Sequence, residues 1–342
     1  MNRLRRTWLF VGAIKSVIKS RFWSHRPFFV SHLITTRCFA KCPTCLWRGN
    51  SPEEKDTAKV IEFYREARQE GFVSTTFWGG EPLLREDIFD ILKACQKLGL
   101  VTGVITNGYL LPKYYRQLVA HLDFLIVSID IPSQEHDRLR GVEGICHNAI
   151  EGLKLVKAEN PRLKIFLNSV VSKLNYPHVE GLTHLAESLE TSITFESVNT
   201  GQPEFARNGG AGVVDFRLPG EKEKQLFRRI RLLKAKHSCI NNSTSYLKLF
   251  ESGKVNYRCH APKISIRVEP NGDVTNCLDR RDPIGNVYQD KLGSIIRGRK
   301  MRWLQQAAEG CCRCVDSGTI ESSLFWDFNP EAMLSAFRLF LR

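Results

Sequence analysis

The feature that most constrains the fold is an alternation, from about residue 30 onward, of short apolar runs with longer segments of helical periodicity. We expect strands at residues 30–36, 73–78, 101–106, 124–130, 164–171 and 192–198. We expect helices between them at residues 54–70, 86–98, 112–121, 145–159 and 177–189. This alternation predicts an α/β fold with a parallel sheet and right-handed crossovers, and it leaves a barrel, a partial barrel and a doubly wound sheet open.

The chain departs from this alternation after about residue 198. Residues 199–220 are rich in glycine and proline, and a basic amphipathic helix is expected at about 221–237. Five cysteines follow Cys239, and a hairpin signal lies at 264–277. We therefore expect an N-terminal segment 1–29, a sheet-forming domain 30–237, a cysteine-rich domain 238–328 and a tail helix 329–342.

Composition and charge narrow the class of protein. Of the 342 residues, 42% are hydrophobic and 25% are charged, which excludes a disordered chain. No apolar stretch reaches the roughly 20 residues that span a bilayer, and residues 8–14 are too short for a signal peptide and lack a cleavage site downstream. The net charge of +14 favours an acidic partner, such as an anionic membrane, a nucleic acid or a phosphorylated substrate.

Half of the excess charge lies at the N-terminus. Residues 1–26 hold seven basic residues and no acidic one, together with several aromatic residues. Basic and aromatic residues at helical spacing are typical of a helix that lies on a membrane surface. A helix docked on the protein's own body would show the same pattern, so both interpretations stay open.

The cysteines indicate metal or redox chemistry. There are eleven, and they are clustered, which predicts a reducing, cytoplasmic compartment. Cys38, Cys42 and Cys45 form a C-x3-C-x2-C run directly after the first strand. Three thiolates on one loop can hold three irons of a [4Fe–4S] cluster and leave the fourth iron open to a ligand. The alternatives are three unrelated buried cysteines and a zinc site, although His32 on the preceding strand is expected to face away.

A second motif, Gly79-Gly80-Glu81-Pro82, lies at the end of the next strand. Two glycines allow the backbone to approach a ligand closely. Glu81 supplies an acceptor for an ammonium group, and Pro82 fixes the turn into the following helix. Alone the motif is weak, but its place one strand–helix unit after the cysteine loop makes it specific.

Together these motifs resemble the radical S-adenosylmethionine (radical SAM) family over about residues 30–237. The resemblance implies a partial (β/α)6 TIM-like barrel in which Cys38, Cys42 and Cys45 hold a [4Fe–4S] cluster. The open iron would bind the amino and carboxylate groups of S-adenosylmethionine. One electron would then cleave the sulfur–C5′ bond, giving methionine and a 5′-deoxyadenosyl radical that abstracts a substrate hydrogen.

The resemblance also implies further cofactor contacts. Residues 79–81 resemble the stretch that receives the methionyl amine. Ser128 and Asp130 end the fourth strand, where the family often contacts the ribose, and Asn168 is similar to a polar residue near the ribose or carboxylate. Purely structural roles for these three side chains stay open. Thr44 stands where many members carry an aromatic residue, and Trp47 is a candidate substitute, a lid or a core residue.

The later cysteines form a second constellation, which resembles the Twitch appendage, a shortened SPASM domain that holds one auxiliary [4Fe–4S] cluster. Its four implied ligands are Cys259, Cys277, Cys311 and Cys314. Cys312 is a spare that could replace Cys311, and a structural zinc site is the alternative. We expect Cys95 and Cys239 to pack in the core, and we assign no role to Cys146.

The resemblance sets the reaction but leaves the substrate open. The basic N-terminal segment, and a faint resemblance of residues 246–260 to radical SAM enzymes of lipid modification, favour hydrogen abstraction from, or adenosylation of, a hydrophobic or lipid-linked small molecule. We then expect a flavodoxin or ferredoxin as electron donor and a location at the inner face of the membrane. By position alone, Glu196 and Arg217 are candidates for charged residues at the barrel mouth.

Three other functions are weighed. A peptide maturase of the SPASM/Twitch type fits the auxiliary cysteines, but the 30 residues before the first strand are too few for the usual peptide-binding segment. A non-catalytic electron-transfer or redox-sensing protein would not need the glycine motif at residues 79–82. A nucleic-acid partner is suggested by charge alone, so we do not expect one.

Overall fold

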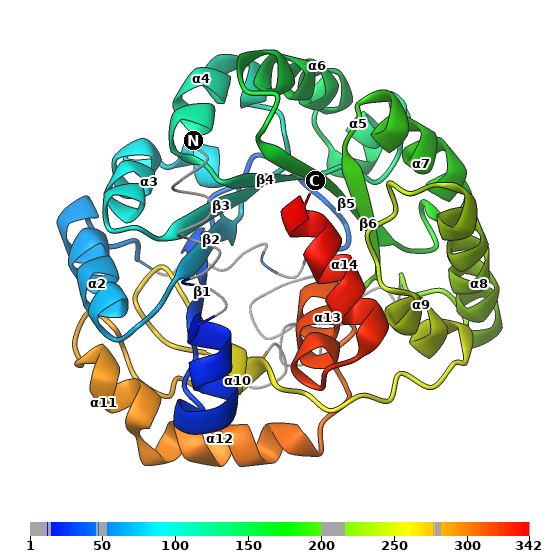
Figure 1. Ribbon diagram of the computed structural model, residues 1–342. Coiled ribbons are helices and arrows are strands. Elements are labelled where there is room, and N and C mark those ends of the chain that lie inside the picture. The colour runs from blue at the N-terminus through cyan, green and yellow to red at the C-terminus, as the bar shows by residue number, and fades with distance from the viewer. Residues whose placement is uncertain are drawn as a thin grey trace.

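The architecture is a curved sheet wrapped by helices, seen in the computed structural model (Figure 1). The structure describes residues 12, 15–45, 47, 53–199, 216–275, 277 and 282–341. Its parallel strands run in the order β6-β5-β4-β3-β2-β1-β7. Their bounds are β1 Phe29–Thr35, β2 Ser74–Gly79, β3 Val101–Thr106, β4 Phe124–Ser128, β5 Lys164–Val171, β6 Ser192–Ser197 and β7 Ser265–Val268. The sheet forms the partial α/β barrel that the resemblance implied, with β6 and β7 as its edges.

Helices cover the outer face of the sheet, one after each of the first six strands (Figure 1). They are α2 Thr57–Gln69, α3 Ile88–Lys97, α4 Leu111–His121, α6 Ile145–Glu159, α7 Val179–Ser188 and α8 Gly220–Lys236. A short helix that the sequence analysis did not anticipate, α5 Glu135–Arg140, precedes α6. The six expected strands and six expected helices are thus confirmed to within a few residues.

Alternate residues of β1 face the helices and the barrel interior, as the pleat of a strand requires. His32 faces the helices: it is fully buried, and its Nδ1 lies 2.8 Å from the hydroxyl of Tyr64 on α2. Burial lowers the pKa of His32 to about 3, with the nearby Arg85 charge adding to the effect. His32 is therefore a neutral core residue that points away from the cysteine loop, as expected.

The sequence analysis expected the seventh strand only as part of a hairpin at 264–277, and it missed the pairing of this strand with the barrel sheet. β7 pairs in parallel with β1, from Ser265 opposite Phe29 to Val268 opposite His32. The expected hairpin is present around an antiparallel bridge between Val268 and Val274: the Thr275 N–H donates to the Arg267 carbonyl at 3.0 Å, and the Glu269 N–H donates to the Asp273 carbonyl at 2.9 Å. The cysteine-rich part of the chain thus contributes directly to the barrel sheet.

The helices that follow α8 are α9 Thr244–Glu251, α10 Ala261–Ile264, α11 Leu292–Arg297, α12 Arg299–Glu309, α13 Ser317–Trp326 and α14 Pro330–Leu341. Helices α11 and α12 continue the outer ring beyond α2, α9 lies beside α8, and α10, α13 and α14 lie between these two groups (Figure 1). Helix α11 is held to α2, because Arg297 Nη1 donates to Glu70 Oε2 at 2.6 Å and the Leu292 N–H donates to Glu66 Oε1 at 2.9 Å. The expected tail helix is present as α14.

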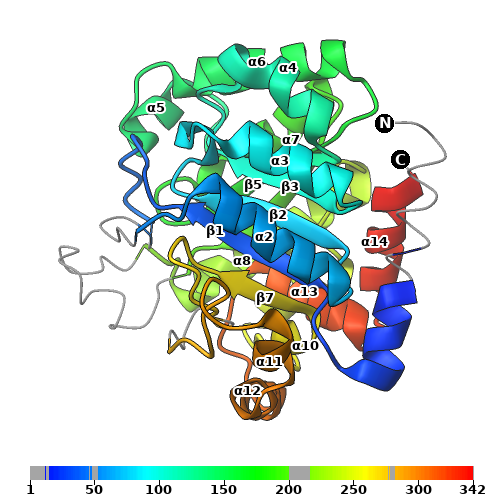
Figure 2. The same cartoon turned by 90° about the vertical axis from the view of Figure 1, so that its left-hand side faces the viewer.

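The N-terminal helical segment continues into a π-helical turn, η1 Ser20–Ser24, which contacts the junction between α13 and α14 (Figure 2). Arg21 Nε donates to the Trp326 carbonyl at 3.2 Å, and Phe22 stacks on Phe328 with ring centroids 6.1 Å apart. The described end of this segment is therefore docked on the protein, while Trp23 remains 73% exposed. Residues 1–11, 13 and 14 lie outside the described residues. Within the part that the structure describes, no helix has the length and apolar character needed to cross a bilayer.

Candidate cluster and cofactor site

The cysteine loop follows β1 at the carboxyl end of the sheet, where α/β barrels build their active sites. The Cys45 N–H donates to the Cys42 carbonyl at 3.2 Å, which folds the second half of the loop into a turn. Burial raises the pKa of the Cys38 thiol to about 11, and Cys42 and Cys45 are close enough to add to the rise. The three predicted thiols thus lie together on one loop. Bound iron would hold them as thiolates.

The glycine motif lies directly against the start of this loop. The Gly80 N–H donates to the Thr35 carbonyl and the Glu81 N–H to the Arg37 carbonyl, both at 2.8 Å. A Cβ on Gly79 would lie 2.0 Å from the Thr35 oxygen, and one on Gly80 would lie 2.2 Å from the Arg37 oxygen. The glycines are needed because the two backbone segments run side by side here, a contact that the sequence analysis did not foresee.

Glu81 is fully buried, and its carboxylate is held by three donors of the protein. Oε1 accepts from the Leu83 N–H at 3.1 Å and the Thr106 hydroxyl at 2.8 Å, and Oε2 accepts from the Asn107 N–H at 2.8 Å. Burial raises the pKa of Glu81 to about 7, because the charged form is poorly solvated there. A hydrogen bond from the amino group of a cofactor would favour the ionised form of Glu81. This carboxylate therefore suits the role that the resemblance implies, which is to accept a hydrogen bond from the methionyl amine.

Asp130 is engaged by the protein itself. Its Oδ1 accepts from the Val170 N–H at 3.0 Å, and its Oδ2 accepts from Arg140 Nη2 at 2.6 Å. Arg140 also directs Nη1 toward the Cys42 sulfur at 3.6 Å, and its carbonyl accepts from the Lys41 N–H at 2.7 Å. Asp130 therefore positions a half-buried arginine beside the cysteine loop, and the sequence analysis did not assign this arginine to the site.

Ser128 and Asn168 lie opposite each other on β4 and β5, on the barrel side of the sheet. The Asn168 amide donates to Glu196 Oε1 on β6 at 2.9 Å. Arg217 forms a paired ion bridge with Glu223 on α8, with N–O distances of 3.0 and 2.9 Å.

Glu196 links the barrel to the second cysteine region. Its Oε2 accepts from the backbone N–H and the hydroxyl of Ser317, at 3.1 and 2.9 Å. Ser317 begins α13, three residues after Cys314. Burial raises the pKa of Glu196 to about 7, and the Asp316 charge adds to the rise. This carboxylate can therefore hold a proton near neutral pH. The sequence analysis had named Glu196, by its position alone, as a candidate for the barrel mouth.

Two tryptophans and an arginine lie on the opposite side of the barrel. Trp78 Nε1 donates to the Ser31 hydroxyl at 2.8 Å, and the Trp47 ring meets Trp78 edge-on with centroids 5.0 Å apart. The Arg267 guanidinium lies 5.4 Å from the centre of the Trp47 ring. Trp47 is therefore packed inside the barrel. The sequence analysis did not assign Trp78 and Arg267 to the barrel interior. Alternation along a strand shows that side chains point to two faces, but it does not show which face lines the barrel and which packs against the helices.

The later cysteines come from three segments that converge. Burial raises the pKa of Cys259 to about 11, with Cys311 and Cys277 close enough to contribute. Burial and Asp316 raise the pKa of Cys314, and Cys259 also contributes. Cys312, the spare, is exposed. The four predicted ligands therefore lie in one neighbourhood.

The remaining three cysteines are buried, and two of them were expected in the core. The Cys239 thiol donates to the Thr183 carbonyl at 3.7 Å, and the Cys146 thiol donates to the Ile131 carbonyl at 4.0 Å. Cys95 is packed within α3. These side chains pack in the core, as expected for Cys95 and Cys239.

Two regions of the chain match known families. Residues 33–186 match the radical SAM superfamily, and residues 259–315 match the iron–sulfur cluster-binding domain called SPASM. The chain belongs to the radical SAM superfamily, and it is a radical SAM enzyme with a C-terminal SPASM-type domain. Its cofactors are a [4Fe–4S] cluster, S-adenosylmethionine and auxiliary iron–sulfur. This membership favours iron–sulfur over zinc at both cysteine sites and an enzyme over an electron carrier.

Two curated relatives are PqqA peptide cyclases. That of Gluconobacter oxydans (strain 621H) is 29% identical over 162 residues, which is 46% of this chain and 45% of that protein. That of Xanthomonas euvesicatoria pv. vesicatoria (strain 85-10) is 23% identical over 315 residues, which is 82% of this chain and 81% of that protein. The match to the first therefore spans less than half of that relative's length.

Two solved structures share the fold. SuiB of Streptococcus suis, bound to its precursor peptide SuiA, superposes with a TM-score of 0.66 at 18% identity, covering 93% of this chain and 78% of SuiB. The enzyme anSMEcpe, with bound AdoMet and Cp18Cys peptide, gives a TM-score of 0.63 at 16% identity, covering 92% of this chain and 98% of that one. At these identities the likeness establishes the fold.

Proposed function

We propose that this enzyme abstracts a hydrogen atom from a peptide, and thereby modifies it. The observation that carries the proposal is the similarity over most of the chain, in sequence and in fold, to enzymes described by their peptide substrates, namely the PqqA peptide cyclases and SuiB. A lipid-linked or other small-molecule substrate, which the sequence analysis favoured, has no comparable support. The peptide alternative therefore takes its place.

The residues around the first cysteine loop would bind the cofactors. Bound there, the cluster and S-adenosylmethionine supply a 5′-deoxyadenosyl radical, which takes a hydrogen atom from a substrate C–H bond. Glu81 would accept a hydrogen bond from the cofactor's amino group. The backbone pairing of residues 35–37 with 79–81 fixes the main chain of Glu81, and its carboxylate is held by the three donors described above. Arg140 would place positive charge beside the Cys42 thiolate.

The barrel interior offers contacts that suit a peptide. Asn168 and Glu196 present an amide and a carboxylate on one side, and Trp47 presents an aromatic face on the other. Amide and carboxylate groups can pair with peptide N–H and C=O groups. Glu196 would also accept a proton if the modified residue loses one, since burial holds its pKa near neutrality at about 7.

The test of this proposal is deuterium transfer. Short peptides encoded beside the gene are synthesised with deuterated side chains and incubated with reduced, cluster-loaded enzyme and S-adenosylmethionine. We expect deuterium in the 5′-deoxyadenosine and a mass change in one peptide. A parallel incubation uses a deuterated lipid extract from the host cell. Deuterium transfer from the lipid and from none of the peptides would contradict the proposal.

Two partner assignments remain proposals. We propose a flavodoxin or ferredoxin as the electron donor. We also propose a peripheral membrane contact through residues 1–26, supported by the exposure of Phe22 and Trp23 at 56% and 73%. Sedimentation with anionic vesicles should fall when residues 1–26 are deleted, and unchanged sedimentation would contradict the membrane contact.

A further inference from the structure

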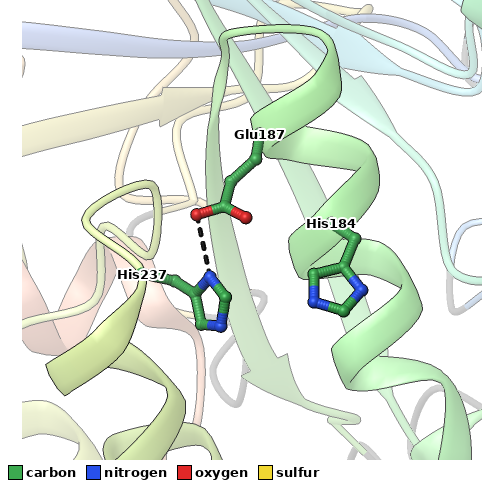
Figure 3. A group of neighbouring side chains, drawn as sticks. All are labelled: His184, Glu187 and His237. Atoms are coloured by element: carbon green, nitrogen blue, oxygen red, sulfur yellow. Dashed lines mark hydrogen bonds and ion pairs between the residues drawn. The ribbon is translucent and has the colours of Figure 1, made fainter.

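A group of metal-ligand side chains lies outside the barrel, where α7 meets the end of α8. His184 and Glu187 are three residues apart on α7, so they share one face of that helix. His237 caps the C-terminus of α8. One ligand atom from each of the three residues lies within 4.8 Å of the other two. Figure 3 shows the three side chains in one group that joins the two elements.

The geometry is close to that of a bound ion. Glu187 Oε1 lies 2.8 Å from His237 Nδ1, and the rings of His184 and His237 have centroids 5.5 Å apart. With metal–ligand bonds of about 2.0–2.1 Å, tetrahedral ligand atoms lie about 3.3 Å apart. Because His184 and Glu187 are exposed and His237 is half-buried, small side-chain rotations can close the remaining gap. Solvent can supply a fourth ligand.

An ion pair alone does not account for the arrangement. The ion pair between Glu187 and His237 uses only one imidazole, yet a second imidazole, that of His184, lies beside it. Two imidazolium rings at this distance would repel, whereas two neutral rings and a carboxylate are a ligand set for a metal ion. A neutral His237 can turn Nδ1 into a ligand by carrying its proton on Nε2.

The segment that follows His237 gives the site a structural consequence. It runs along the β6 edge of the barrel: the Ile193 N–H donates to the Cys239 carbonyl and the Asn241 N–H to the Ile193 carbonyl, both at 2.8 Å. Asn242 adds two further hydrogen bonds to Phe195 of β6, at 2.8 and 2.9 Å. A metal ion on His237 would therefore tie α7 to the segment that covers an edge strand.

We propose that His184, Glu187 and His237 bind one zinc ion that braces α7 against the end of α8. Two imidazoles and one carboxylate favour a borderline metal such as Zn²⁺, whereas Mg²⁺ and Ca²⁺ require mostly oxygen ligands. The site is separate from both cysteine constellations and takes no part in the radical reaction. It does not rest on the proposed substrate.

The test counts zinc bound to the full-length, cluster-loaded protein, with Zn²⁺ alone as the probe. After anaerobic dialysis against buffered micromolar Zn²⁺, we expect one more zinc per chain in the wild type than in His184→Gln, at equal iron content. Glu187→Gln and His237→Gln should each weaken zinc binding at least about tenfold. His147→Gln removes an exposed histidine elsewhere, on α6, and should bind zinc like the wild type.

A second measurement separates metal binding from a folding defect. Zn²⁺ should raise the melting temperature of the wild type and leave that of His184→Gln unchanged, because a ligand stabilises only a protein that binds it. The rate of 5′-deoxyadenosine formation should be equal in both. The proposal is overturned if the wild type binds no zinc beyond that of His184→Gln, or if His147→Gln loses it equally.

Discussion

Two regions of the molecule bring cysteine thiols together, the loop after β1 and the cysteine-rich part of the chain after residue 258, but they do so by different means. The first set, Cys38, Cys42 and Cys45, lies within eight consecutive residues, so local chain geometry already brings the thiols together. The second set comes from segments at 259, 277 and 311–314, which meet only because β7 joins the sheet and α10 to α13 fill its open side.

The difference also separates two kinds of chemistry. Three thiolates leave one iron open to a ligand, whereas four thiolates close a cluster. We therefore propose that the first site would bind the cofactor that is cleaved, and that the second would hold or pass an electron. Glu196 lies between them, bonded through Ser317 to the segment that follows Cys314. The predictions below test this division of roles, from the largest expected effect to the smallest.

Replacing a thiol of the first loop should abolish the reaction. Cys42→Ser should reduce 5′-deoxyadenosine formation to the level without enzyme, because the cluster loses one of its three ligands. The measurement is chromatography of the reduced reaction mixture, with iron counted per chain. Substantial cofactor cleavage by Cys42→Ser would contradict the assignment of this loop.

Replacing a thiol of the second set should separate cofactor cleavage from product formation. Cys314→Ser should keep 5′-deoxyadenosine formation within a few-fold of the wild type while the mass-shifted peptide is lost. Cys312→Ser is the matched control, since Cys312 is exposed and outside the predicted ligand set, and it should keep both activities. Equal loss in the two variants would break the comparison between the sites.

Removing the proton-accepting group should have a smaller effect. Glu196→Gln should lower product formation by roughly a hundredfold, the usual contribution of a general base, and leave cofactor cleavage in place. The amide keeps the shape and can still meet Ser317. Because the pKa of Glu196 is raised to about 7, the wild-type product rate should increase as pH rises from 6 to 8, and this dependence should vanish in the variant.

Glu81 should make cofactor affinity depend on pH. Its pKa is raised to about 7, so the ionised form that accepts the amino hydrogen bond is lost as pH falls below that value. S-adenosylmethionine should then bind up to about tenfold more weakly per pH unit, since one unit corresponds to about 1.4 kcal/mol. The Glu81→Gln variant should bind S-adenosylmethionine weakly and with the same affinity at every pH. If its affinity still depended on pH, another group would be responsible for the dependence.

The smallest expected effect concerns backbone packing. Gly80→Ala would place a Cβ 2.2 Å from the Arg37 oxygen, and should lower the free energy of unfolding by about 1–3 kcal/mol. Gly220→Ala is the control, because a Cβ there meets nothing within 4 Å. Its effect should stay within about 0.5 kcal/mol in the same denaturant titration.

Much of the fold and of the first site could be predicted from the sequence. Six strands of five or more residues alternate with long helices, and this periodicity is strong. The loop at Cys38 to Cys45 and the glycine motif are local, so their spacing in sequence is their spacing in space. The hairpin at β7 could be predicted from its turn residues, but the pairing of β7 with the barrel sheet could not, because its partner β1 lies more than 200 residues away.

The side-chain contacts inside the barrel could not be predicted either, because they also depend on how separate segments of the chain meet. The ion pair of Asp130 with Arg140 and the bond of Glu196 to Ser317 join side chains whose neighbours are decided by how strands and loops meet. Charge at the N-terminus led toward a lipid substrate, because net charge reports on surfaces and says little about what a barrel interior binds.

The measurement that tests the central claim most directly is electron paramagnetic resonance of the reduced, iron-loaded protein in which Cys259, Cys277, Cys311 and Cys314 are all replaced by serine. We predict one [4Fe–4S] signal that changes on addition of S-adenosylmethionine, together with 5′-deoxyadenosine. A cluster signal at Cys38, Cys42 and Cys45 that the cofactor leaves unchanged would contradict an open iron at this loop.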